Sequence, residues 1–177
     1  MPVLKVICSQ DAAMIKRTGS RRYQDDMAIE EVVNYVLSPQ KTCQSLVGGI
    51  AVSPGQAAFE MRRLSQAYGK FEGLRLRHMV LSFSKDEIRR FGKRAYDILM
   101  RIAFYAAQFY GHDYQIVYAV HTDAENLHIH FVMNSVSYRT GRKYPGTKAD
   151  YHEFCSYLGD FLMEYFSMPL TPVSDVG

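Results

Sequence analysis

Three histidines, His121, His128 and His130, lie close together near the middle of the chain. A neutral imidazole is a frequent ligand of divalent metal ions, and three of them can hold an ion while leaving coordination positions open for a substrate. A lone His-x-His pair, however, is usually only a feature of a half-exposed strand. Metal chemistry therefore requires that the backbone bring the third histidine onto the same patch.

The residues around the histidines indicate two short strands joined by a turn. Tyr114–His121 and Leu127–Tyr138 are rich in β-branched and aromatic residues, whereas Asp123–Asn126 has the polar composition of a turn. If the turn is centred between Ala124 and Glu125, residues that face each other across the strands have numbers that sum to 249. The hairpin register can thus be predicted from the sequence.

This register places all three histidines on one face of the hairpin. His121 lies directly opposite His128, and His130 follows two residues further along the same face. The other face is apolar and suited to a core; its residues are Ile116, Tyr118, Val120, Leu127, Ile129, Phe131 and Met133. The spacing therefore predicts a preformed divalent-metal site.

The segment His121–Asn134 also has the pattern His-x-Asp-x-x-Asn-x-His-x-His-x-x-x-Asn. It resembles the third motif of conjugative relaxases, the mobilisation nucleases of the MOBP group, which belong to the superfamily of His-hydrophobe-His (HUH) endonucleases. The resemblance implies the palm-like fold of that superfamily. Its motifs extend over nearly the whole chain.

A segment of the N-terminal half, Asn34–Thr42, resembles the first relaxase motif, whose tyrosine is the nucleophile that cleaves DNA. By this resemblance Tyr35 is the candidate nucleophile, and we expect Lys41 and Thr42 to contact the DNA. The segment 27–37 has the apolar spacing of a helix, and Tyr35 falls at the flank of its buried stripe. Tyr23 is the alternative nucleophile because it lies in a basic loop.

The segment 78–83 resembles the second relaxase motif, in which a histidine leads into Ser-Phe. The resemblance implies that Ser82 holds the DNA strand near the cleavage site. Without it, Ser82 is an ordinary strand residue and His78 an ordinary half-buried histidine. This is the weakest of the three motif matches, and the third is the strongest.

The remaining periodicities predict an α+β fold, a largely antiparallel sheet with helices packed on one face. Capping boxes are expected at Ser53 and Ser84, the second opening one long helix that continues to Tyr110. The end, Pro169–Gly177, is expected to be frayed. Further strands are expected over 2–9, 46–52 and 74–83, and further helices over 53–68 and 147–166.

The chain has 177 residues, a net charge of +3 and three cysteines. We expect a single relaxase domain over residues 1–177, followed by a further C-terminal region of the parent protein. The odd cysteine number and the lack of a signal peptide favour the cytoplasm, and no apolar run is long enough to insert into a membrane. The small positive charge permits a nucleic-acid partner without requiring one.

The resemblance implies a metal-dependent enzyme that nicks single-stranded origin-of-transfer DNA and forms a 5′-phosphotyrosyl intermediate. Nitrogen ligands favour Mn²⁺ over Mg²⁺ as the divalent ion. Asp123 is expected to orient an imidazole or to act as base, and Asn134 to position the site by hydrogen bonds. The basic residues Arg139, Arg142 and Lys143 are expected to follow the phosphate backbone. A DNA hairpin, a relaxosome accessory protein and a coupling protein are the further expected partners.

Three other functions stay open at this point. An HUH replication initiator or transposase is one, although those relatives place the tyrosine after the histidine motif. The second is a metal-dependent hydrolase that activates water, and the third is a DNA-binding module with structural histidines. A covalent DNA adduct at Tyr35 would distinguish the relaxase from the last two.

Overall fold

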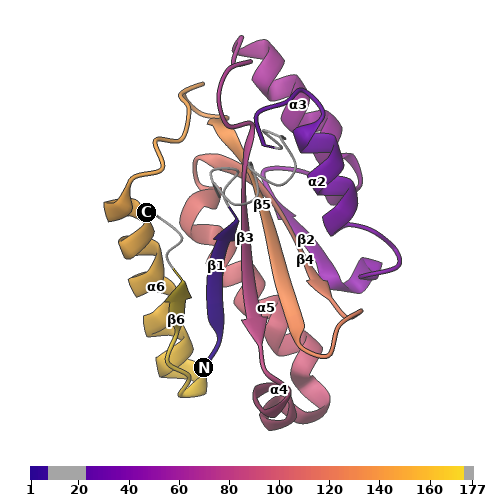
Figure 1. The fold of residues 1–177 in the computed structure, drawn as a ribbon, viewed down its shortest axis with the longest axis vertical. Coiled ribbons are helices and arrows are strands. Elements are labelled where there is room, and N and C mark those ends of the chain that lie inside the picture. Colours follow the sequence, from indigo (N-terminus) through magenta and orange to yellow (C-terminus); the bar gives the residue numbers. More distant parts are fainter. Residues whose placement is uncertain (8–22, 174–177) are drawn as a thin grey trace, which may run out of the picture.

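A computed structural model describes residues 1–7 and 23–173. Within them the chain forms a six-stranded sheet with the strand order β2-β4-β5-β3-β1-β6 (Figure 1). Neighbouring strands are antiparallel except β1 and β6, which are parallel. The strands are β1 (Val3–Ile7), β2 (Val47–Ile50), β3 (Leu76–Phe83), β4 (Tyr114–His121), β5 (Leu127–Ser137) and β6 (Thr171–Val173).

Helices pack on both faces of this sheet, so the expectation that they cover one face is wrong (Figure 1). The α+β class and the largely antiparallel sheet are confirmed. The helices are α2 (Ala28–Val36), α3 (Ala57–Ala67), α4 (Lys85–Phe91), α5 (Ala95–Gly111) and α6 (Lys148–Phe166), with short 3₁₀ turns η1 (Gln44–Leu46), η2 (Pro54–Gln56) and η3 (Gly92–Arg94). No helix in the described ranges combines the length and apolar character that a membrane span requires.

The pleat of the central strands produces two separate cores. On one face, Phe131 and its neighbours pack against α5 and α6. On the other, Val117 and Val132 pack against Val33 of α2 and Met61 of α3. Because successive side chains point to opposite faces of a strand, β4 and β5 are buried on both sides over most of their length. The hairpin is therefore the centre of the fold.

The predicted register of this hairpin is confirmed. His121 pairs with His128, and Ala119 pairs with His130, so both pairs have numbers that sum to 249. The register shifts only at the far end, between Tyr114 and Ile116. The histidines thus share one face, and the apolar side chains of the other face lie in the larger core.

Three local expectations are wrong. The helix that begins after Ser84 does not continue to Tyr110, because Gly92 has a φ of 59° and a short 3₁₀ turn separates α4 from α5. Ser53 makes no capping bond with its side chain. The expected frayed end contains β6, whose residues pair with β1. Most of the basic loop 11–26, and residues 174–177, lie outside the described residues.

The capping box at Ser84 is confirmed and gives a stability prediction. The Glu87 backbone N–H donates to the Ser84 hydroxyl, and the Glu87 carboxylate accepts from the Ser84 backbone N–H at 2.8 Å. Burial by itself would raise the pKa of Glu87, but the hydrogen bonds from Ser84 and the nearby amino terminus hold it below its usual range. We expect Ser84→Ala to lower the free energy of unfolding by about 1 kcal/mol in urea denaturation at neutral pH.

The pH dependence follows from the lowered pKa of Glu87. A carboxyl with a lowered pKa in the folded state stabilises the protein above its unfolded pKa, and this contribution is lost as the pH falls through the folded pKa. The difference in the free energy of unfolding between Ser84→Ala and the parent should therefore become smaller in acid. Ser53→Ala is the matched control, because Ser53 makes no capping bond and its loss should cost little. Equal destabilisation by both changes would contradict this account.

Candidate active site

The three predicted histidines lie on the face of the sheet that α2 partly covers. The ring centroids of His121 and His130 are 4.0 Å apart, and those of His128 and His130 are 6.2 Å apart. Across the next strand pair, Ser82 of β3 lies opposite His128. Among the described residues, no three His, Cys, Asp or Glu side chains are arranged as a ready set of metal ligands. The register brings the imidazoles together, but they lie beside one another rather than around a common point.

Each of the two deeper imidazoles uses one ring nitrogen in a hydrogen bond. His121 Nε2 donates to the backbone carbonyl of Val36 at 2.8 Å, and His130 Nδ1 lies 2.9 Å from His78 Nε2. The Tyr23 hydroxyl in turn lies 3.3 Å from His78 Nδ1. The second ring nitrogen of His121 and of His130 is thereby kept for another partner.

His78 is the residue that sequence reasoning missed. It is buried, and it connects Tyr23 to His130. The signal for it was the pairing of β3 with β5, in which His78 lies opposite Val132 on the histidine face. That pairing joins segments far apart in the chain, and only the local hairpin register could be predicted.

Burial keeps these imidazoles neutral. It lowers the pKa of His121 and of His128 below the usual imidazole range. For His130, burial and then the charges of the neighbouring imidazoles lower the pKa to about 2. Only a neutral imidazole has a lone pair for a metal or a proton. The site therefore offers nitrogen lone pairs at neutral pH.

Tyr35 lies at the edge of this cluster. Its side chain is 41% exposed, and its ring centroid is 5.7 Å from that of His121 and 5.9 Å from that of His130. Tyr23 is only 5% exposed. A nucleophile must reach a substrate in solvent, so accessibility favours Tyr35 over Tyr23. The bond from His121 to the carbonyl of Val36 fixes the end of α2 that carries Tyr35.

A lysine and an aspartate complete the surroundings of Tyr35. Lys41 Nζ lies 4.9 Å from the centroid of the Tyr35 ring and 2.6 Å from Asp123 Oδ2. The backbone N–H of Thr122 donates to the carbonyl of Lys41 at 2.8 Å, so the loop after α2 is held against the hairpin turn. The Lys41–Asp123 ion pair positions a cation beside the phenol.

Asp123 forms an ion pair with Lys41. The hydrogen bond from Lys41 lowers the pKa of the Asp123 carboxyl, and the bond to Asp123 raises the pKa of Lys41. A carboxylate that is ion-paired and has a lowered pKa is a weak base. Its hydrogen-bond partner is Lys41, so in this structure Asp123 orients a lysine.

Two other predicted residues are buried and serve the fold. The Asn134 amide donates to the carbonyl of Met61 and to Gln115 Oε1, both at 3.1 Å, so it connects α3 to the sheet. Within the described residues it makes no hydrogen bond to the histidines. Thr42 is also buried, and its hydroxyl has no hydrogen-bond partner within the described chain. Its expected contact with DNA would therefore require movement of the loop.

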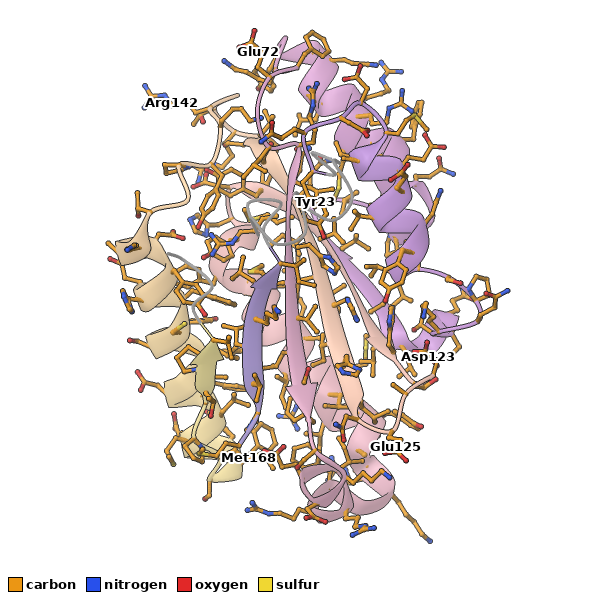
Figure 2. All side chains as sticks on the ribbon, in the orientation of Figure 1. Tyr23, Glu72, Asp123, Glu125, Arg142 and Met168 are labelled. Atoms are coloured by element: carbon orange, nitrogen blue, oxygen red, sulfur yellow. The ribbon has the colours of Figure 1, made fainter. Side chains whose placement is uncertain are left out.

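The basic segment expected to follow the phosphate backbone lies apart from this site. Figure 2 shows Arg142 at the opposite end of the molecule from Asp123. Arg139 pairs with Asp113 at 3.6 Å, and the Lys143 ammonium donates to the carbonyl of Glu72 at 2.7 Å. Of the three basic side chains, Arg142 alone forms no ion pair or side-chain hydrogen bond within the described residues. The segment can contribute to a DNA path only at a distance from Tyr35.

Two known proteins are similar to this chain. Protein rlx of Staphylococcus aureus is 32% identical over 97 residues, which cover 55% of this chain and 28% of that relative. A solved structure, titled "Molecular Basis of Vancomycin Resistance Transfer in Staphylococcus aureus", matches 72% of this chain and 75% of its own at 11% identity with a TM-score of 0.47.

The family comparison covers most of the chain. The model of the relaxase family, described as "MobA/VirD2-like, nuclease domain", matches residues 35–165. The match begins at Tyr35 and includes the whole β4–β5 hairpin with its three histidines. The chain therefore belongs to the relaxase family, with a MobA/VirD2-like nuclease domain.

Proposed function

We propose that this chain is the nicking domain of a conjugative relaxase and that Tyr35 cleaves single-stranded origin-of-transfer DNA. The observation that carries the proposal is the placement of an accessible Tyr35 against His121, His130 and Lys41 in a chain of the relaxase family. In the step, a bond forms between the Tyr35 oxygen and phosphorus while the bond from phosphorus to the 3′ oxygen breaks. The phenol proton is lost, and the leaving 3′ oxygen gains one.

The Lys41 ammonium supports this attack electrostatically. A phenol has a pKa near about 10 and is a poor nucleophile at neutral pH. A cation 4.9 Å from the Tyr35 ring centroid favours the phenolate over the phenol, and it can also attract the scissile phosphate. Asp123 holds the cation in place and leaves the pair without net charge. Lys41 is thus assigned to catalysis, and Asp123 to positioning.

The histidine cluster fits a divalent metal ion by its chemistry. The three imidazoles are neutral, and the hydrogen bond to the Val36 carbonyl leaves a lone pair on His121 Nδ1. In the tautomer in which His130 Nδ1 donates to His78 Nε2, a lone pair also remains on His130 Nε2. Imidazoles that ligate metals commonly use their other nitrogen in this way. When bound by His121, His128 and His130, the ion would polarise the scissile phosphate as a Lewis acid. Nitrogen donors favour Mn²⁺ over Mg²⁺.

The proposed substrate and partners follow the same family. We propose a DNA strand with a hairpin next to the nick, and an accessory protein and a coupling protein in the assembled complex. Because the chain spans 28% of the length of the staphylococcal relative, further domains of the parent protein would contribute to these contacts. A hydrolase that activates water is the second candidate, and it is distinguished by the lack of a covalent adduct.

The first test concerns the nucleophile. We expect Tyr35→Phe to abolish the covalent protein–DNA adduct, because the change removes the attacking oxygen, and to leave folding nearly unchanged, because the side chain is partly exposed. The measurement is a denaturing gel after incubation of the protein with Mn²⁺ and single-stranded oligonucleotides from its own genetic neighbourhood.

Tyr23→Phe is the matched control for that test. It removes a hydroxyl that is buried and lies beside His78, so it should weaken adduct formation at most severalfold. An adduct that forms with Tyr35→Phe and fails with Tyr23→Phe would exchange the roles of the two tyrosines. Hydrolysed DNA without an adduct in the parent protein would favour the hydrolase.

A second test concerns the metal. Alanine in place of His121, His128 or His130 should each weaken Mn²⁺ binding strongly in calorimetric titration. His78→Ala should weaken it by roughly 10- to 100-fold, because His78 supports His130 through the second ring nitrogen. Alanine at the exposed His112 or His152 should leave it unchanged. Parent-like affinity in His121→Ala would remove that residue from the ligand set.

A third test concerns Lys41. Lys41→Met should slow adduct formation by roughly 100-fold, since the loss of one preorganised charge beside a reacting oxygen typically has this size. Lys41→Arg should restore part of the rate. Asp123→Asn should slow adduct formation in a protein that retains Lys41. It should slow it little further in the Lys41→Met background, because both residues act through one ion pair. Additive effects in the double variant would assign Asp123 a separate role.

A further inference from the structure

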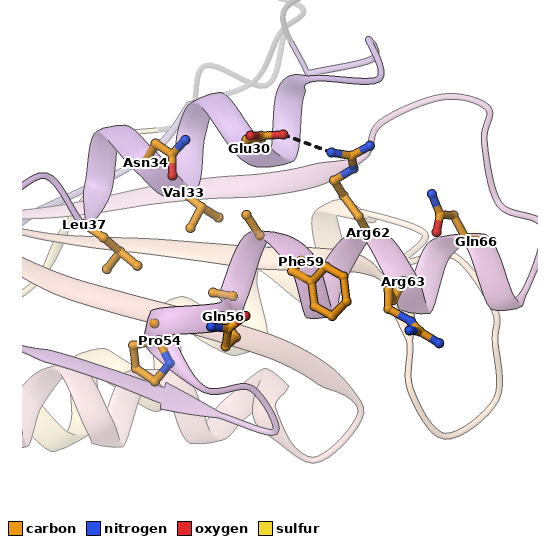
Figure 3. A pocket seen from close by; sticks show the side chains of 13 residues that line it. Glu30, Val33, Asn34, Leu37, Pro54, Gln56, Phe59, Arg62, Arg63 and Gln66 are labelled. Atoms are coloured by element: carbon orange, nitrogen blue, oxygen red, sulfur yellow. Dashed lines mark hydrogen bonds and ion pairs between the residues drawn. The ribbon is translucent and has the colours of Figure 1, made fainter.

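The groove between α2 and α3 is lined by residues that the nicking reaction does not use. It encloses about 560 Å³, and Figure 3 shows its two walls, one from α2 and one from η2 and α3. We propose that this groove binds unpaired bases of the DNA strand next to the nick. The inference rests on the proposed function, because it names where part of the same substrate lies.

An exposed aromatic ring forms one wall. Phe59 of α3 is 58% exposed, and the guanidinium carbon of Arg63 lies 5.6 Å from the centroid of its ring. Proteins that bind single-stranded nucleic acid stack bases on aromatic rings and on guanidinium planes. A single exposed phenylalanine is common on protein surfaces, so the assignment depends on what surrounds Phe59.

Side-chain amides from both walls line the same groove. Asn34 of α2, Gln56 of η2 and Gln66 of α3 all line the groove and are exposed. None of these amides makes a hydrogen bond within the chain that the structure describes. An amide carries donors and an acceptor, which match the edges of unpaired bases. The groove therefore offers hydrogen bonds that the fold itself leaves unused.

The charges of the groove select an anionic strand over an apolar helix. Arg62 is paired with Glu30 across the two helices at 2.9 Å, as the dashed line in Figure 3 shows. Arg63 has no carboxylate partner in the described part of the chain, so its charge is left for a phosphate. The apolar floor is narrow, with Val33 and Ala57 buried beneath the polar rim. An amphipathic helix would need a longer apolar surface.

The groove lies within reach of a strand held at Tyr35. Asn34 precedes Tyr35 on α2, and Leu37 follows it by two residues and lines the end of the groove. The Tyr35 ring contacts the histidines, whereas Asn34 and Leu37 face α3, so the two sites lie on different flanks of one helix. A helix with its side chains is about 10 Å across. A strand can pass from one flank to the other within a few nucleotides.

The chain contains no tryptophan, which makes a direct test possible. Phe59→Trp in a Tyr35→Phe background introduces a single tryptophan, whose fluorescence can be excited selectively, into a protein that cannot form the adduct. We expect titration with a thymidine oligonucleotide of about 20 nucleotides to quench this fluorescence. Phe104→Trp is the matched control, because Phe104 is 48% exposed on α5, which packs against the other face of the sheet. Its fluorescence should not change.

Affinity measurements complete the test. By fluorescence anisotropy of the labelled oligonucleotide, Phe59→Ala should bind about tenfold more weakly, because one stacking contact is lost. Arg63→Gln should lower the slope of log affinity against log salt by roughly one, because one phosphate contact is lost. Phe104→Ala should leave both quantities unchanged.

Several outcomes would overturn the inference. One is an unquenched Phe59→Trp at concentrations where anisotropy reports binding, and another is no binding of the oligonucleotide at all. Fluorescence that changes with protein concentration in the absence of DNA would assign the groove to a second copy of the chain. In contrast, quenching in the tryptophan variant, together with no adduct in the protein that retains Tyr35, would contradict only the proposed nicking function, and the inference that the groove binds DNA would stand.

Discussion

The pairing of β4 with β5 is the constraint on which the rest of the structure depends. Successive side chains of a strand alternate between faces, so the register determines on which face of the sheet every side chain of the hairpin lies. With His121 opposite His128, the imidazoles share the face toward α2 while Ile129 and Phe131 enter the larger core. A slip by one residue would place the histidines among α5 and α6 and turn the apolar side chains toward α2. The burial of Ile129 and Phe131 therefore stabilises the same register that assembles the site.

The hairpin alone does not make the site, because its other parts come from distant segments of the chain. Backbone carbonyls bind two of these segments to β4: that of Val36 accepts from His121, and that of Lys41 accepts from Thr122. Both attachments use groups at the end of β4, so the end of α2 and the loop after it are held where Tyr35 meets the imidazoles. The position of Tyr35 is thus set by the packing of α2 against Val132 and its neighbours.

The features that could be predicted from the sequence are local ones. The register of β4 with β5 depends on a short turn, and the cap at Ser84 depends on residues three apart, and both are confirmed. The features that were missed depend on distant contacts. The bond of His78 to His130 requires the pairing of β3 with β5, and the ion pair that takes Asp123 away from the imidazoles joins residues 82 positions apart. The break at Gly92 is local, but the positive φ that produces it could not be inferred from a strong apolar stripe.

The electrostatics of the site depend on which of its side chains are charged. Burial removes the charge from the histidines, so among the described residues Lys41 is the permanent cation in contact with the Tyr35 ring, and Asp123 balances its charge. A scissile phosphate that enters this neutral pair would compete with Asp123 for the ammonium, and the lysine could follow the phosphate without leaving the phenol. Under the proposed function, this exchange of one anion for another would let a chain with a net charge of only +3 place positive charge at the reacting phosphate. The positive charge is that of Lys41, and the substrate phosphate would replace Asp123 as its partner.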